Sequence, residues 1–288
     1  MKRVLVLGAT GRVGTLLRRS WEQETLQDDN VVLTFQTRKT QHARSGDLEW
    51  NILDPFPVQN PDAAAFDCMI VLAGVVPGPH ADLGLNTPIG QASVNAAAQL
   101  KIPRMLLAST SAVYGTHSDA PLAEDALLMP VNDYGHAKRT MEQTCLKQAN
   151  ALGIELCCLR IGNVAGADAL VCNGTALDQG ETLTLDQFED GGTPIRSYIG
   201  PHSFARVLMS LARTSQPLPN TLNIAAPQPV SMHALAQAAG FPVTLRPAKN
   251  SAHQHITLNC TALTKLHRFN PIETQPREII RQWRSCKS

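Results

Sequence analysis

Two side chains at the start of a predicted helix could exchange a proton with a bound molecule. Tyr134 precedes Lys138 by four positions in the segment NDYGHAKRTME, so the phenol and the ammonium group would share one face of a helix. As an isolated surface pair they would stabilise a helix by about 0.2–0.5 kcal/mol. Beside a bound cofactor, the positive charge would instead favour the phenolate and lower the pKa of the tyrosine from its reference of about 10. Tyr134 is then a candidate acid or base, and the elements around it decide between these interpretations.

A glycine-rich loop near the N-terminus predicts a dinucleotide site. The sequence VLVLGATGRVG places three glycines directly after an apolar strand and at the start of the first helix. Glycine permits the tight turn, the approach of the backbone to a pyrophosphate, and close packing of the helix on the sheet. The positive end of the helix then faces the phosphates. The loop residues predicted to bind the cofactor are Gly8, Thr10, Gly11, Arg12, Val13 and Gly14.

The end of the second predicted strand bears on the choice of cofactor. An NAD site usually has an acidic side chain there for the ribose hydroxyls, but this chain has FQTRKT and no Asp or Glu between residues 30 and 46. Arg38, with Lys39 beside it, could neutralise a 2′-phosphate. Alternatively, Arg38 is a solvated loop residue, as most arginines are. We favour NADP over NAD on this pattern.

The first 165 residues alternate short apolar runs with helical stretches. Nearly continuous apolar runs are typical of parallel strands that are covered on both faces. Strands are predicted over residues 3–7, 31–36, 68–73, 104–109 and 154–160, and helices over 12–26, 84–99 and 133–152. Such alternation predicts an α/β fold with a Rossmann-type doubly wound parallel sheet.

The alternation of predicted strands and helices ends after Gly166. Residues 167–195 are rich in Asp, Gly and Thr, with a turn at EDGGTP. Beyond them, a helix at 202–214, a strand at 221–226 and helices at 231–239 and 275–285 are predicted, with a further strand or two. We expect a dinucleotide-binding domain formed by residues 1–165 and 196–226, and a small α+β substrate-binding cap formed by 166–195 and 227–288.

Hydroxyl groups follow the predicted strand at 104–109, in LLASTSAVYG. Ligands bind outside the carboxyl ends of parallel strands, where a hydroxyl could hydrogen-bond a substrate oxygen. Thr110 and Ser111 are the candidates, unless they only satisfy backbone groups at the strand end. With the glycine loop and the Tyr134–Lys138 pair, this set resembles the extended short-chain dehydrogenase/reductase superfamily, in particular its epimerase/dehydratase-like branch. The resemblance covers residues 1 to about 226 and rests on GATGRVG, VLAGV, STSAVYG, YGHAK, LRIGNVAG and RSYIG.

The resemblance implies a role for each matching residue. Tyr134 would be the acid or base, Lys138 would bind the nicotinamide ribose and tune the tyrosine, and Thr110 would hold the substrate oxygen with Ser111 beside it. Asn86 falls where the family has an asparagine that organises the lysine through water, although it could instead cap a helix. The other implied cofactor contacts are Asn51 (where the family usually has Asp) and Ile52 at the adenine, Leu72, Ala73 and Gly74 at the ribose and phosphates, and Ile161 at the nicotinamide.

Two further matches concern the substrate. Asn163 and Arg196 fall where nucleotide-sugar epimerases of this family hold a diphosphate, and a guanidinium suits phosphate or carboxylate equally well. The chain continues with GPHSFA, where those relatives usually have His-Val and an Asp, and the expected cap is short. A smaller polyol, uronate, hydroxyketone or aldehyde is therefore an equal alternative to a sugar nucleotide. Dehydration is disfavoured, because Ser111 and Ala112 replace the Asp-Glu pair of the family's dehydratases.

The sequence thus predicts an NAD(P)-dependent oxidoreductase or epimerase. Hydride would pass between the nicotinamide and a carbinol or carbonyl carbon of a sugar-like or small hydroxy/keto substrate. The alternative is an NADP(H)-sensing regulator that has lost catalysis. A protein that no longer needs catalysis would be expected to have lost Tyr134 or Lys138, and both are present. A structural or RNA-associated role is disfavoured by the formal net charge of +1 and the 5% aromatic content.

Composition sets the expected compartment. No apolar run approaches the roughly 20 residues that cross a bilayer, and the N-terminal run breaks at Gly8 without a signal-peptide cleavage site. Seven cysteines without a CxxC pair indicate free thiols, and Cys157 and Cys158 should point to opposite faces of a strand. These features favour a reducing cytoplasm.

The remaining expectations concern partners. His253 and His255 have no second ligand cluster, so no metal is expected. Neither nucleic acid nor a membrane is expected to bind a chain of nearly neutral charge. The resemblance implies a homodimer through the helices at 84–99 and 133–152.

Overall fold

A seven-stranded sheet forms the centre of the computed structural model, which describes residues 1–24, 31–38, 44–57, 65–116 and 120–287. Every neighbouring pair of its strands is parallel. In spatial order the strands are β11 (Thr221–Ile224), β6 (Glu155–Ile161), β5 (Arg104–Thr110), β4 (Cys68–Val71), β1 (Lys2–Leu7), β2 (Val31–Thr37) and β3 (Leu48–Glu49). The order reverses between β1 and β4, and doubly wound sheets bind ligands at the carboxyl ends beside such a reversal.

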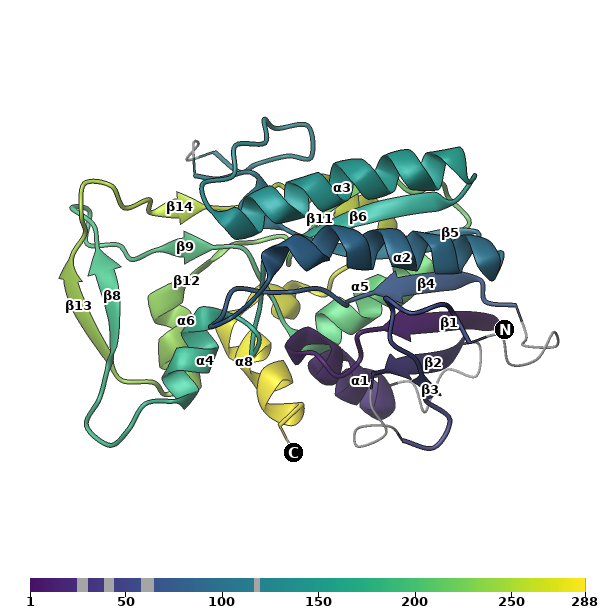
Figure 1. Ribbon diagram of the computed structural model, residues 1–288. Coiled ribbons are helices and arrows are strands. Elements are labelled where there is room, and N and C mark those ends of the chain that lie inside the picture. Colours follow the sequence, from purple (N-terminus) through teal and green to yellow (C-terminus); the bar gives the residue numbers. More distant parts are fainter. Residues whose placement is uncertain (25–30, 39–43, 58–64, 117–119, 288) are drawn as a thin grey trace.

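Two layers of helices cover the sheet (Figure 1). They are α2 (Asn86–Gln99) and α3 (Asp133–Ala151) on one face, and α1 (Arg12–Glu24) and α5 (Pro201–Arg213) on the other. Each strand points alternate side chains into the two layers, so Val6 packs on the α1–α5 side and Leu7 on the α2–α3 side. Cys157 and Cys158 are divided between the layers in the same way, which confirms the prediction for this pair.

A smaller lobe extends beyond the carboxyl ends of the strands (Figure 1). Its elements are β7 (Asn163–Val164), α4 (Ala169–Thr175), β8 (Leu183–Gln187), β9 (Ile195–Arg196), β10 (Tyr198–Ile199), β12 (Val230–Ser231), α6 (Met232–Ala239), β13 (Val243–Pro247) and β14 (His255–Ile256). The following helix, α7 (Thr261–Leu266), instead packs against β11 of the central sheet. Within the lobe, α6 was predicted from the sequence. Its ends carry clear signals, because the Ser231 side chain accepts a hydrogen bond from the backbone N of Ala234 and Gly240 closes the helix with a φ of 72°.

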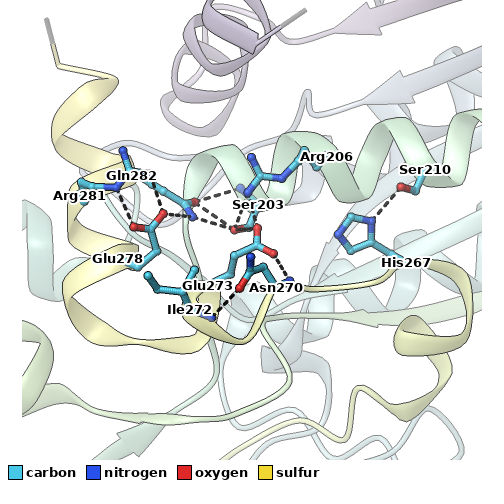
Figure 2. Close-up of polar contacts among 10 residues, drawn as sticks. All are labelled: Ser203, Arg206, Ser210, His267, Asn270, Ile272, Glu273, Glu278, Arg281 and Gln282. Carbon is cyan, nitrogen blue, oxygen red and sulfur yellow. Dashed lines mark hydrogen bonds and ion pairs between the residues drawn. The ribbon is translucent and has the colours of Figure 1, made fainter. Parts of the chain in front are cut away.

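The C-terminal segment folds back onto α5 through η5 (Pro271–Thr274) and α8 (Pro276–Ser285). Glu273, which is 5% exposed, accepts hydrogen bonds from the hydroxyl of Ser203 at 2.7 Å and from the backbone N of Asn270 at 2.6 Å, and it pairs with Arg206 (Figure 2). α8 also packs against α6. Part of the expected cap therefore lies against the helix layer of the sheet.

The structure confirms the predicted fold class and the order of the predicted strands and helices. The predicted strand at 68–73 ends earlier, at Val71, and the predicted helix at 84–99 begins with a separate turn, η3 (Leu83–Leu85). The division into domains stays a prediction. Over the described ranges, no helix combines the length and apolar character needed to cross a membrane. Within the same ranges, no three His, Cys, Asp or Glu side chains are grouped to hold a metal ion.

Candidate active site

The turn from β1 into the first turn of α1 leaves no room for side chains at two glycines. Gly8 has a φ of +83°, and a Cβ there would lie 2.4 Å from the backbone N of Ala73 at the end of β4. A Cβ on Gly14 would lie 2.2 Å from the carbonyl oxygen of Gly8. The first turn of α1 is thus held close to the carboxyl ends of β1 and β4. The N–H groups of Arg12, Val13 and Gly14 lie in this turn and have no acceptor within the helix. A helix N-terminus of this kind fits a pyrophosphate.

A cavity of about 360 Å³ lies at the carboxyl ends of the sheet strands, beside the start of α1. It is lined by the glycine loop, by the ends of several strands and by the first turns of α3. The predicted site residues that line it are Gly11, Arg12, Val13, Gly14, Leu72, Gly74, Thr110, Tyr134, Lys138, Ile161 and Asn163. The structure therefore brings the glycine loop, the hydroxyl at the end of β5 and the Tyr134–Lys138 pair to one cavity.

The first turns of α3 direct Lys138 toward β5 of the sheet. Asn132 caps the helix by accepting a hydrogen bond from the backbone N of Gly135 at 2.8 Å, so Tyr134 lies in the first turn and Lys138 one turn further. The Nζ of Lys138 donates to the carbonyl oxygen of Ala108 at 2.8 Å, and the side chain is 4% exposed. Burial lowers the pKa of this lysine to about 8, because the charged form is poorly solvated.

Tyr134 is half-buried and lines the main cavity together with Thr110. Burial raises the pKa of the phenol above its ordinary value of 10, while the Thr110 hydrogen bond and the charge of Arg12 act in the opposite direction. The expectation that Lys138 lowers this pKa is therefore wrong for this structure. The cation that opposes the effect of burial is Arg12, from the glycine loop, and Lys138 is engaged with Ala108.

Thr110 also caps the short helix that follows β5. Its Oγ1 accepts a hydrogen bond from the backbone N of Ala112 at 3.2 Å. Thr110 therefore satisfies a backbone group at the strand end and also lines the cavity that contains Tyr134. Ser111 begins this helix, η4 (Ser111–Val113), and lines a second cavity instead of the one that contains Lys138.

Asn86 is fully buried at the start of α2 and ties down the loop that follows β4. Its Oδ1 accepts from the backbone N of Val75 at 3.1 Å, and its Nδ2 donates to the carbonyl oxygen of the same residue at 2.9 Å. The N-cap of α2 is Leu85, so a role of Asn86 as the cap of this helix is wrong. A Cβ on Gly74 would lie 2.9 Å from Oδ1 of Asn86 and 3.2 Å from Nζ of Lys138, so these two polar groups converge behind Gly74.

The residues predicted to bind the adenosine lie around the ends of β2 and β3. Gln36, which is 1% exposed, accepts a hydrogen bond from the backbone N of Gly8 at 3.0 Å and donates to the carbonyl of Trp50. A neutral amide therefore holds the glycine loop at the end of β2. Arg38 is exposed directly beyond this strand, and Lys39 lies outside the described residues.

Six predicted cofactor residues do not contribute to the lining of the main cavity. Gly8 packs closely against the backbone of Ala73, outside the cavity lining, and Ile52 is buried in the core after β3. The six residues are Gly8, Thr10, Arg38, Asn51, Ile52 and Ala73.

The second cavity, of about 300 Å³, continues from the first toward the smaller lobe. The two cavities share Thr110, Gly162 and Asn163 in their linings. The Nδ2 of Asn163 donates to the carbonyl oxygen of Ser197 at 3.4 Å, which joins the end of β6 to the β9–β10 segment. This position suits the part of a substrate that extends beyond the reacting carbon.

Arg196 lines the second cavity and is held by backbone groups. Its Nη1 donates to the carbonyl oxygens of Ile195 and Gln254, both at 2.8 Å, and its Nη2 donates to that of His253 at 3.1 Å. Among the described residues, no carboxylate pairs with it, and burial lowers its pKa. The wall of the cavity thus carries a cation whose charge is not balanced by a neighbouring described side chain.

Several lining residues were not predicted. Val75, at the end of the VLAGV segment, lines the main cavity with the next two residues, Val76 and Pro77, and Asp168 lines it too. Asp168 caps α4 and accepts a hydrogen bond from the hydroxyl of Tyr198 at 3.0 Å. An Asp three residues after NVA, before an apolar run, is a recognisable N-cap signal that could have located this helix.

The parallel sheet and the glycine loop before α1 define a Rossmann-type dinucleotide-binding fold. The sequence model of the NAD dependent epimerase/dehydratase family matches residues 4–224, and the chain belongs to this family. UDP-glucose 4-epimerase of Azospirillum brasilense is 36% identical over 91 residues, which are 32% of this chain and 26% of that protein. UDP-glucose 4-epimerase of Lactobacillus helveticus is 28% identical over 179 residues, 58% of this chain and 53% of that protein. The matches thus span about half or less of these relatives' length.

Solved structures agree with this fold over the whole chain. The UDP-Glc/GlcNAc 4-epimerase from Campylobacter jejuni superposes with a TM-score of 0.77 at 18% identity, covering 100% of this chain and 99% of that chain. UDP-glucose 4-epimerase from Brucella ovis, in complex with NAD, gives a TM-score of 0.77 at 21% identity, covering 98% of this chain and 97% of that chain. At these identities the similarity establishes the fold.

Proposed function

We propose that this chain is a nicotinamide-dinucleotide-dependent oxidoreductase or epimerase, in which Tyr134 is the acid or base. The observation that carries the proposal is one cavity, at the carboxyl ends of a parallel sheet, that contains the glycine loop, Thr110, Tyr134 and Lys138. Family membership supports the same assignment.

The residues present fit the cofactor. The free N–H groups at the start of α1 would bind the pyrophosphate, and Lys138, behind Gly74, would reach the ribose next to the nicotinamide. When bound, the nicotinamide would supply or accept a hydride. Tyr134 would move the accompanying proton at the substrate oxygen, and Thr110, which lines the same cavity, would bind the same oxygen.

The second cavity supports a substrate with an anionic group. Arg196 offers a positive charge beyond Thr110, and Asn163 lies between the two cavities. Several relatives are named as UDP-sugar 4-epimerases, and a sugar nucleotide therefore remains one candidate. A volume of about 300 Å³ is at the lower end of the range for small-molecule sites, so a uronate or a small hydroxy/keto acid is the other.

The cofactor preference is part of the proposal. The neutral amide of Gln36 at the end of β2 and the exposed Arg38 support NADP. The family description and the solved neighbours that contain NAD support NAD. We retain NADP as the preferred cofactor to be tested.

A homodimer and a cytoplasmic location complete the proposal. The dimer would form through α2 and α3, which lie side by side on one face of the molecule (Figure 1). All seven cysteines are free thiols, which suits a reducing compartment. Sedimentation of the purified protein tests the dimer.

Tyr134→Phe tests the catalytic role. The variant should bind NADP⁺ within a few-fold of the unchanged protein and should lose turnover of every probe that the unchanged protein converts. Suitable probes are UDP-glucose, glucuronate and dihydroxyacetone. Retained turnover would remove Tyr134 from the mechanism. Tight cofactor binding without turnover of any probe by the unchanged protein would favour the regulatory alternative.

A further inference from the structure

Glu142 lies one helical turn beyond Lys138, and the two side chains hold consecutive residues of β5. Lys138 donates to the carbonyl oxygen of Ala108 at 2.8 Å, and the hydroxyl of Ser109 donates to Oε1 of Glu142. Ser109, which directly precedes Thr110, is 4% exposed, and Glu142 is 2% exposed. The end of β5 is therefore held from α3 by one cation and one anion.

Arg160 holds Glu142 from the neighbouring strand, β6. Its Nη2 lies 2.9 Å from Oε2 of Glu142 and its Nε 3.2 Å from the same oxygen. Ser109 and Arg160 are directly opposite each other in the β5–β6 ladder, so the carboxylate spans both strands. The Nη1 of Arg160 donates to the hydroxyl of Tyr114 at 3.0 Å and to the carbonyl oxygen of Glu124 at 2.8 Å.

The same network reaches the wall of the second cavity. The hydroxyl of Tyr114 donates to Oδ1 of Asn223 at 2.7 Å, and Nδ2 of Asn223 donates to the carbonyl oxygens of Leu122 and Asn259, at 2.9 and 3.0 Å. Leu122 lines this cavity and forms a β-bridge with Leu258, which lines it too. One buried polar network thus connects the catalytic end of β5 to the substrate side.

Stability alone is a poor reason for such a network. A buried ion pair loses hydration that its mutual attraction only partly replaces, and well-packed apolar side chains in its place are often as stabilising. Buried polar groups with several directed hydrogen bonds do, however, fix geometry. Here the fixed element is the residue next to Thr110.

We propose that Glu142, held by Arg160, is a positioning residue that fixes Ser109 and thereby keeps the hydroxyl of Thr110 against Tyr134. This inference rests on the proposed function of the cavity. Glu142 lines neither cavity. It is also not among the causes that set the pKa of the Tyr134 phenol, which are burial, the side chain of Thr110 and the charge of Arg12. The charge of Glu142 also acts on Lys138, whereas the hydroxyl of Ser109 connects Glu142 to the residue next to Thr110. Removing that hydroxyl therefore isolates the route through Thr110.

A second buried glutamate provides a matched control. Glu273 accepts a hydrogen bond from the hydroxyl of Ser203 and pairs with Arg206, as Glu142 does with Ser109 and Arg160 (Figure 2). It joins η5 to α5 and lines neither cavity. Substitutions there should disturb packing to a similar degree without moving Thr110.

The test follows the ionisation of Tyr134 by NMR of protein labelled with ¹³Cζ-tyrosine. The chain has three tyrosines, so three signals are expected, and Tyr134→Phe identifies the relevant one. The hydrogen bond of Thr110 favours the phenolate, so its loss should raise the apparent pKa of Tyr134. We expect a rise of about one unit in Glu142→Gln and in Ser109→Ala, and no change in Glu273→Gln and Ser203→Ala.

An unchanged Tyr134 titration in Ser109→Ala would overturn the proposal, and so would an equal shift in Glu273→Gln. If Glu142→Gln does not fold, Ser109→Ala decides alone, because it removes one hydroxyl and leaves the ion pair intact. No turnover is measured in this experiment. A failure of the proposed function, seen as activity retained by Tyr134→Phe, is therefore distinguishable from a failure of this inference.

Discussion

The ammonium group of Lys138 is held 2.8 Å from the carbonyl oxygen of Ala108, two residues before the end of β5. Together with the hydrogen bond from Ser109 to Glu142, this contact joins the helix that carries Tyr134 to the strand that carries Thr110. It also places a charged group in an almost fully buried position, which has a measurable effect on stability.

Replacing Lys138 by methionine should remove a pH-dependent cost of folding. In the unfolded chain the pKa is about 10.5 and in the folded protein it is about 8, so between these values the folded state binds fewer protons and its stability rises with pH. The difference corresponds to about 3 kcal/mol, partly offset in the variant because the carbonyl of Ala108 loses its donor. Urea unfolding at pH 7 and pH 10 should show Lys138→Met gaining most, relative to the unchanged protein, at pH 7. A relative stability that is the same at both pH values would contradict the buried charge.

Two glycines of the first loop should respond differently to alanine. A Cβ on Gly14 would lie 2.2 Å from the carbonyl oxygen of Gly8, so Gly14→Ala should lower the free energy of unfolding by about 1–3 kcal/mol. A Cβ on Gly11 would lie 3.5 Å from the same oxygen, an ordinary contact, yet Gly11 lines the main cavity. Gly11→Ala should therefore fold normally and bind cofactor more weakly.

Thermal unfolding and cofactor titration separate these two effects. Gly78→Ala is the control, because a Cβ there has no neighbour within 4 Å among the described atoms and Gly78 is outside the cavity lining. It should change neither quantity. Equal cofactor affinity in Gly11→Ala and the unchanged protein would argue against a pyrophosphate at this loop.

Arg38→Asp should reverse the preference between cofactors. Arg38 is exposed just beyond β2, where a positive charge would favour the 2′-phosphate and an acid would favour the free ribose hydroxyl. Fluorescence titration of the unchanged protein should give tighter binding of NADPH than of NADH, and the variant should give the opposite order. Tighter binding of NADH by the unchanged protein would contradict the preference for NADP.

Arg196→Gln should weaken binding of an anionic substrate about tenfold or more, because the guanidinium is the charged side chain in the lining of the second cavity. Comparing glucuronate with its uncharged parent sugar, glucose, by isothermal titration in the presence of NADP⁺ isolates the charge. Arg246→Gln is the control, since Arg246 pairs with Asp186 on the β8–β13 pair and lines neither cavity. A loss of affinity equal for both sugars would point to packing instead of charge.

Local patterns were sufficient to predict most of the sheet and much of the cavity. Continuous apolar runs located β1, β4, β5 and β6, and the glycine spacing located the start of α1. The paired thiols of Cys157 and Cys158 were assigned to opposite faces from strand geometry alone.

Contacts between distant segments were not predictable in the same way. The pairing of β8 with β13 joins Leu183 to Val243, and no local signal specifies that register. The role of Arg12 was missed for a related reason. Its charge acts on Tyr134 only because the folded sheet brings the glycine loop opposite α3, whereas the sequence places Lys138 nearest to the tyrosine.

The adjacent thiols of Cys157 and Cys158 on β6 can report which of the two core layers becomes accessible when the protein begins to unfold. Burial raises the pKa of both Cys157 and Cys158, so neither reacts readily with an alkylating reagent while its helices stay in place. A reagent must enter the core on the α1–α5 side of the sheet to reach the first thiol, and the core on the α2–α3 side to reach the second. Peptide mapping after brief alkylation would therefore tell which side of the molecule loosens first under heat or denaturant.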